Sequence, residues 1–229
     1  MPFDQGTLVV PTSNAAGANF PDMMIQAKLV KKMQGPVSPG DLQRITAKVA
    51  GLRDRMRGLW GGGVCLVMSC FWLRCAMAGQ FTRTDNGDLA SAQTRYQAYA
   101  AMKLMKTGDT DASVAKASAK IAEEFELQLV TTTKLDAGSD FGLEMDLADP
   151  LTTSPSAYIL SVAVQGGSHA IALYVADGNS LYVLDPNYGV YRYDSSGMLI
   201  TDLVGLFFGG SQVYSNLTGA VLKRMEYKP

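Results

Sequence analysis

The chain has 229 residues, of which 47% are hydrophobic and 18% charged, and its 20 basic and 21 acidic side chains give a net charge of −1. This hydrophobicity with so little net charge excludes a chain that is disordered throughout. The charge balance also argues against nucleic acid as a partner, because there is no basic excess to neutralise phosphates.

The N-terminal residues show neither a targeting signal nor a regular element. The sequence MPFDQGTLVV lacks the basic start and long apolar stretch of a secretory signal. Residues 1–21 are rich in Gly, Pro, Ser and Asn, so we expect a flexible arm, followed by a single domain over residues 22–229. We expect the protein in the cytoplasm when it is made, or exported from there by a specialised secretion system.

Helical patterns dominate up to about residue 130. In the stretch 38–59, apolar side chains recur at spacings of three and four, as on one helical face. Residues 64–78 are apolar on nearly all sides and should form a buried central helix. The uncharged run around them has 16 residues, whereas a bilayer span needs about 20. The predicted helices lie at residues 22–34, within 38–59, and at 64–78, 88–106 and 110–129.

The later part of the chain changes to short β-branched and aromatic runs separated by turn residues. Four consecutive runs predict an antiparallel meander, and a short helix at 197–208 and a closing strand at 220–227 follow. This order predicts an α+β fold with a helical lobe over about residues 22–130 and a sheet lobe over about 131–229. The four runs are residues 157–164, 169–176, 180–185 and 189–194.

The one histidine of the chain, His169, stands at the head of a predicted strand. Asp185 follows sixteen residues later, at the end of the next strand and before Pro-Asn-Tyr-Gly. In a hairpin of this length, the head of one strand lies beside the tail of the next. We therefore expect Asp185 to orient the imidazole of His169 and to stabilise its charged form.

A cysteine suited to nucleophilic chemistry begins the predicted central helix. Cys65 follows three glycines, and the unpaired N–H groups and positive dipole of a helix N-terminus stabilise the reactive thiolate. Cys65, His169 and Asp185 thus match the nucleophile, base and orienting group of a thiol hydrolase. Cys70 and Cys75 are expected to be structural. With one histidine and no Cys-x-x-Cys pair, we expect no metal and no cofactor.

The motifs around these residues resemble those of the YopT-like papain-fold cysteine proteases. In GVCLVMSCFWL, Cys65 is followed by Ser69, Trp72 and Leu73, as in the nucleophile motif of that family, and SHAIALYV and LDPNYGVY resemble its histidine and acid motifs. The resemblance implies a papain-like fold, a Cys-His-Asp triad and a bacterial effector that cleaves a protein substrate. Members of the family act on prenylated small GTPases or on kinases of a host cell. We expect a monomer without a membrane-spanning segment.

The oxyanion donor departs from the usual papain pattern. Papain-fold enzymes carry Gln or Asn about five or six residues before the cysteine, and Leu59 and Trp60 occupy those positions here. We expect the indole N–H of Trp60 and the backbone N–H of Cys65 to stabilise the oxyanion. Two alternatives stay open: a glutamine deamidase or transglutaminase with the same triad, and a catalytically inactive binding module that keeps the fold.

Overall fold

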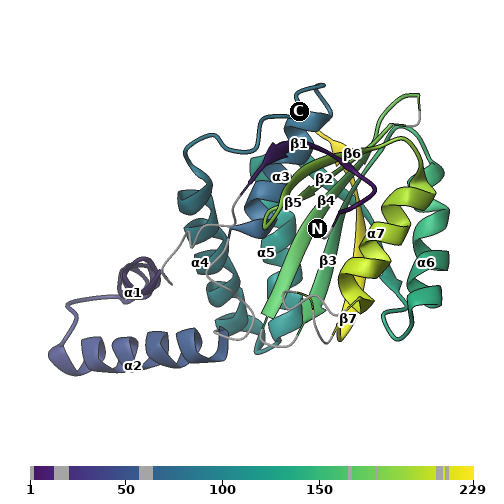
Figure 1. Cartoon of the computed structure of the whole chain (residues 1–229). Helices are drawn as coiled ribbons and strands as arrows, with labels where there is room; N and C mark the ends of the chain where they lie inside the picture. Colours follow the sequence, from purple (N-terminus) through teal and green to yellow (C-terminus); the bar gives the residue numbers. More distant parts are fainter. Residues whose placement is uncertain are drawn as a thin grey trace.

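The centre of the molecule is an antiparallel sheet. The structure is a computed structural model, and it describes residues 3–12, 21–56, 64–164, 167–178, 180–209, 214 and 217–229. Within these residues seven strands pair in the order β1-β6-β5-β4-β3-β7-β2 (Figure 1). The strands are β1 (Thr7–Pro11), β2 (Leu127–Leu135), β3 (Ser156–Val164), β4 (Gly167–Val175), β5 (Leu181–Asp185), β6 (Gly189–Tyr193) and β7 (Gly219–Tyr227).

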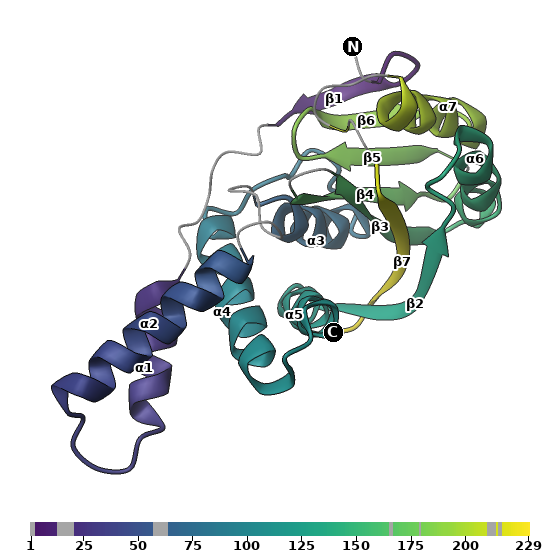
Figure 2. The same cartoon turned by 90° about the horizontal axis from the view of Figure 1, so that it is seen from below.

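Helices cover both faces of this sheet (Figure 2). Side chains of β3 alternate between two hydrophobic cores, because successive residues of a strand point to opposite faces. Ile159 joins the core on the side of α3, α4 and α5, whereas Leu160 joins the core beneath α6 and α7. The helices are α1 (Asp22–Lys31), α2 (Pro39–Met56), α3 (Cys65–Ala76), α4 (Leu89–Thr107), α5 (Thr110–Glu124), α6 (Asp140–Ala148) and α7 (Ser196–Phe208), with a 3-10 turn η1 (Pro150–Thr152).

The strands β3 to β6 confirm the predicted meander, since each pairs antiparallel with the next in the chain. The predicted helix near residues 197–208 is α7, and the Ser195 hydroxyl caps it by accepting a hydrogen bond from the Met198 N–H. The predicted last strand also forms, as β7. It does not close the sheet at an edge, however, because it lies between β3 and β2.

The helix predicted over residues 110–129 ends earlier than expected. α5 stops at Glu124, and Glu126 takes a left-handed backbone conformation with φ of 58°. The sequence that follows, LQLVTTTKL, is rich in β-branched residues and forms strand β2 instead. β2 pairs with β7 along its length, so a partner from the other end of the chain stabilises the extended form.

The arm predicted to be flexible over residues 1–21 is in part a strand. Residues 7–11 form β1, which pairs with β6 at the edge of the sheet. Before it, Phe3 is buried against the ring of Tyr191, with ring centroids 4.7 Å apart. The apolar side chains of this segment and the free edge of β6 explain the difference, because an unpaired edge favours the addition of a strand.

The first two helices form a hairpin that projects from the rest of the protein (Figures 1 and 2). α1 and α2 pack on each other and against α4, and a few of their apolar side chains are buried, among them Ile25, Val49 and Leu52. No helix in the described part of the chain combines the length and the hydropathy that a bilayer crossing requires.

Candidate active site

The central helix α3 carries Cys65 as its first residue. Most of α3 is buried, as its apolar sequence predicts, while Cys65 itself keeps some exposure. Two side chains of the motif fix the helix in place. The Ser69 hydroxyl donates a hydrogen bond to the carbonyl of Ala170 at 3.2 Å, and the Trp72 indole donates to the carbonyl of Phe81 at 2.9 Å. Ser69 thus ties α3 to β4 at the residue after His169.

The histidine and the aspartate meet at the same end of the sheet. β4 and β5 pair Ala172 with Leu184, and continuing this register puts Asp185 one diagonal step from His169, a distance that long side chains bridge. His169 Nε2 lies 3.0 Å from Asp185 Oδ1. The His169 side chain is 8% exposed and that of Asp185 is fully buried, so water hardly competes for this contact.

The thiol of Cys65 lies within hydrogen-bond reach of the same imidazole. Because Nε2 faces Asp185, Nδ1 is the nitrogen left for the sulfur. Burial alone would lower the pKa of His169, but its hydrogen bonds to Asp185 and Cys65 and the attraction of both charges raise it from 6.5 to about 9. The ring is therefore an imidazolium at neutral pH, and it lies beside the sulfur of Cys65.

The carboxylate of Asp185 is held by more than the histidine. The hydroxyl of Tyr214 donates to Asp185 Oδ2 at 2.6 Å, and the backbone N–H of Asn187 donates to Oδ1 at 2.9 Å. The Asn187 amide also donates to the Tyr214 oxygen at 3.0 Å. Burial, followed by the nearby Asp185 charge, raises the pKa of Tyr214 well above its ordinary value, so its hydroxyl remains a donor. The motif resemblance pointed to Asp185 but not to Tyr214.

Comparison with known proteins matches residues 41–229 to the Peptidase_C58 family model, described as Yersinia/Haemophilus virulence surface antigen. This range covers most of the chain and contains Cys65, His169 and Asp185. The chain belongs to this YopT-like family of cysteine proteases. No curated protein compared with the chain matches it.

Two solved structures are similar to this family member. The Pseudomonas avirulence protein AvrPphB aligns with a TM-score of 0.60 and 18% identity, over 71% of this chain and 91% of its own. The cysteine protease-like domain PatoxP of the Photorhabdus asymbiotica toxin PaTox aligns with a TM-score of 0.40 and 11% identity, over 88% and 71% of the two chains. The likeness to AvrPphB supports the predicted papain-like α+β fold.

The other two cysteines of this C58 protease are buried in α3 and form no disulfide. Burial raises the pKa of Cys70 to about 12 and also raises that of Cys75. Both therefore stay protonated thiols near neutral pH. The predicted oxyanion donor Trp60 lies outside the described residues, as does Leu59. Within the described ranges, no group of three or more His, Cys, Asp or Glu side chains is arranged to hold a metal ion.

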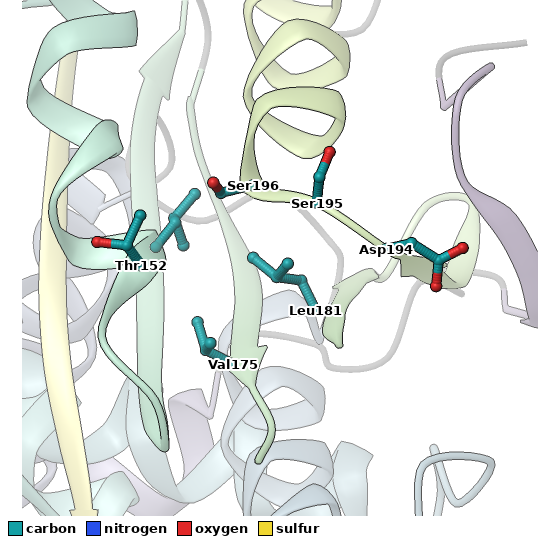
Figure 3. A pocket seen from close by; sticks show the side chains of 7 residues that line it. Thr152, Val175, Leu181, Asp194, Ser195 and Ser196 are labelled. Carbon is teal, nitrogen blue, oxygen red and sulfur yellow. The ribbon is translucent and has the colours of Figure 1, made fainter. Parts of the chain in front are cut away.

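A separate hollow is lined by Val175 and Leu181, among others (Figure 3). Val175 ends β4, whereas His169 stands near its start. The volume of the hollow is about 280 Å³, and it opens where β4 ends and β5 begins. The Ser195 hydroxyl there is already engaged as the cap of α7. With neither Cys nor His in its lining, the hollow does not repeat the chemistry around Cys65. The lining residues are Leu151, Thr152, Val175, Leu181, Asp194, Ser195 and Ser196.

Proposed function

We propose that this cysteine protease cleaves peptide bonds of a protein substrate with Cys65, His169 and Asp185 as its catalytic triad. The observation that carries the proposal is the chain of contacts from the Cys65 thiol through the His169 ring to the Asp185 carboxylate. It provides a nucleophile, a proton carrier and a group that orients the carrier, in the order that thiol hydrolases require.

The reaction proceeds in two stages. The Cys65 thiolate attacks the carbonyl carbon, and His169 gives its proton to the leaving amine, which leaves an acyl group on sulfur. Water then attacks the thioester while His169 takes one of its protons and returns it to the sulfur as the acid departs. Asp185 keeps the ring oriented and stabilises its positive charge throughout.

We infer that the protein acts as an effector after export into another cell, in keeping with the virulence family that its sequence matches. Small GTPases and kinases of a host cell are the first substrates to test, because the motif resemblance implies them. A search for new protein termini in host lysate extends the test to every protein of that cell and identifies the substrate from its cleavage products.

The experiment compares wild-type, Cys65→Ala and Cys75→Ser proteins in such a lysate. New termini should appear with wild-type protein and with Cys75→Ser, and they should be absent with Cys65→Ala. Termini that persist with Cys65→Ala would reject the assignment. If no chain is cut while a glutamine side chain gains about one dalton by hydrolysis of its amide, the deamidase alternative holds instead.

A further inference from the structure

The N-terminal segment, residues 3–12, contains β1 and ends against the turn that follows β5. It precedes the range that matches the family model, residues 41–229, so the likeness to the family assigns it no role. β1 lies along β6 (Figure 2), and their pairing extends to Pro11, which stands opposite Gly189. This pairing brings the end of the segment beside the turn that begins at Asp185.

Hydrogen bonds within this turn fix the carboxylate of Asp185. The backbone N–H of Tyr188 donates to the Asp185 carbonyl at 3.0 Å and closes a four-residue turn. The backbone N–H of Asn187 donates to Asp185 Oδ1 at 2.9 Å, and the same oxygen faces Nε2 of His169. The shape of the turn therefore determines where the carboxylate lies relative to the imidazole.

Thr12 holds the same turn from the side of the N-terminal segment. Its hydroxyl lies 3.2 Å from the carbonyl oxygen of Asp185 and 3.1 Å from that of Pro186. A hydroxyl has one proton to donate, so the two carbonyls share it. Both contacts are partly buried. A residue from the start of the chain thus bonds to the backbone of the aspartate that contacts His169.

Phe3 reaches the other side of the carboxylate through a series of aromatic rings. Phe3 is 2% exposed, and its ring centroid lies 6.2 Å from that of Tyr188. The ring of Tyr188 lies 6.5 Å from that of Tyr214, whose hydroxyl donates to Asp185 Oδ2. Both distances are typical of aromatic pairs. The segment therefore supports the backbone of Asp185 and its carboxylate by two separate routes.

We propose that residues 3–12 are a positioning element of the active site, in which Thr12 and Phe3 hold Asp185 in the orientation that its contact with His169 requires. Thr12 and Phe3 take no part in the reaction itself and act through Asp185. The consequence for catalysis rests on the proposed triad, whereas the consequence for the imidazole can be measured without proteolysis.

The pKa of His169 in folded protein tests the proposal. This is the one histidine of the chain, so labelling histidine with a stable isotope gives a single imidazole to follow by NMR. Burial lowers the pKa of the ring and the contacts with Asp185 and Cys65 raise it, to about 9 overall. Thr12→Val removes the hydroxyl and should lower this pKa by about 0.5 or more, because a weaker carboxylate contact destabilises the imidazolium. Phe3→Ala should lower it as well.

Two control variants separate positioning from a general loss of stability. Thr12→Ser keeps the hydroxyl and should keep the wild-type pKa of His169. Thr152→Val removes a hydroxyl that donates to the carbonyl of Asp149 at 2.8 Å, and it should also leave this pKa unchanged. A pKa of His169 that is the same in Thr12→Val, Phe3→Ala and wild-type protein would overturn the proposal, as would an equal decrease in Thr152→Val.

Turnover distinguishes the failure of this proposal from the failure of the proposed function. On a cleaved peptide, Thr12→Val should lower kcat about threefold or more with little change in KM. If wild-type protein cleaves no chain but Thr12→Val still lowers the pKa of His169, the protease function fails and the positioning of Asp185 stands. If wild-type protein cleaves and Thr12→Val changes neither kcat nor this pKa, the function stands and the positioning role is wrong.

Discussion

A change at Tyr214 tests how far the orientation of Asp185 contributes to the activity of the proposed triad, without touching a group that reacts. Its hydroxyl holds Asp185 Oδ2 at 2.6 Å and its ring lies 5.3 Å from the ring of His169, centroid to centroid. Tyr214→Phe keeps the ring and removes one hydrogen bond to a charged group, a loss of about 1.5–3 kcal/mol. We expect kcat on a cleaved peptide to fall about tenfold with little change in KM.

Tyr193 provides a matched control for this variant. Its buried hydroxyl also donates to a carboxylate, that of Asp202, at 2.8 Å, and it lies in β6, away from the triad. Tyr193→Phe should therefore cost similar stability in urea unfolding and leave kcat unchanged. Equal loss of kcat in the two variants would mean that Tyr214 acts through stability alone.

The three cysteines of α3 offer an internal test of nucleophile activation. Cys65 has partial exposure, the helix N-terminus and the His169 imidazolium, whereas burial raises the pKa of Cys70 to about 12 and raises that of Cys75 as well. Iodoacetamide near neutral pH should label Cys65 first, and peptide mapping by mass spectrometry gives the order. His169→Ala should slow this labelling. If Cys75 reacts fastest in folded protein, Cys65 is not the activated thiol.

The raised pKa of His169 predicts how stability depends on pH. Because the pKa rises from 6.5 to about 9 on folding, the folded protein holds this proton more tightly than the unfolded chain does. The stabilisation is complete below the unfolded value and is lost as the pH rises through about 9. Its size is on the order of 3 kcal/mol. Urea unfolding between about pH 6 and about pH 10 should show this loss in wild-type protein and not in His169→Gln. If the free energy of unfolding depends on pH in the same way in both proteins, His169 is not the source of the loss.

Sequence motifs pointed to Cys65, His169 and Asp185 as the proposed triad, because each stands in a short segment with a distinctive local pattern. Tyr214 could not be found in that way. Tyr214 lies 29 residues beyond Asp185 with no motif around it, and only the folded chain brings the two together.

At the level of elements, the packing of β1 against the edge of β6 depends on Gly189. Its φ is 141°, and a Cβ there would lie 2.5 Å from the carbonyl oxygen of Val10 in β1. Gly189→Ala therefore combines backbone strain with a clash that pushes β1 off the edge of β6. We expect it to lower the free energy of unfolding, measured in urea, by more than the roughly 1–2 kcal/mol that left-handed strain alone costs.

Gly178 provides a control that measures the backbone strain without the steric clash. It also has a positive φ, 82°, but nothing lies within 4 Å of a Cβ built on it. Gly178→Ala should cost only the strain, so Gly189→Ala should be the more destabilising by at least about 1 kcal/mol. If both variants lose the same free energy of unfolding, the contact between residue 189 and β1 adds nothing to the cost of Gly189→Ala.

The elements that sequence patterns predicted well are those stabilised by their own neighbours. The meander from β3 to β6 joins consecutive strands, and α7 carries its own serine cap. The elements that were missed depend on distant partners. β1 forms because β6, far along the chain, leaves an edge open, and β2 forms because β7 pairs with it. The local secondary-structure propensity of a segment carries no information on pairings with strands far along the chain.

At the scale of the whole molecule, the projecting hairpin of α1 and α2 should be the first part of the described chain that a protease cuts. Lys31 at the end of α1 and residues 32–36 after it are all exposed, and Lys32 is among them. Brief digestion with trypsin should cleave after these lysines before it cleaves within α4 or α5, as followed by intact mass. Earlier cleavage within α4 or α5 would contradict this order.

The central place of β7 also has a consequence for when the protein becomes functional during its synthesis. β7 pairs with β3 on one side and is the partner that joins β2 to the sheet, so two unsatisfied strand edges persist until residues 219–227 have left the ribosome. Such long-range closure is slow relative to local folding. The sheet that carries His169 and Asp185 therefore stays incomplete until this last strand is made, so the candidate site is assembled late in synthesis.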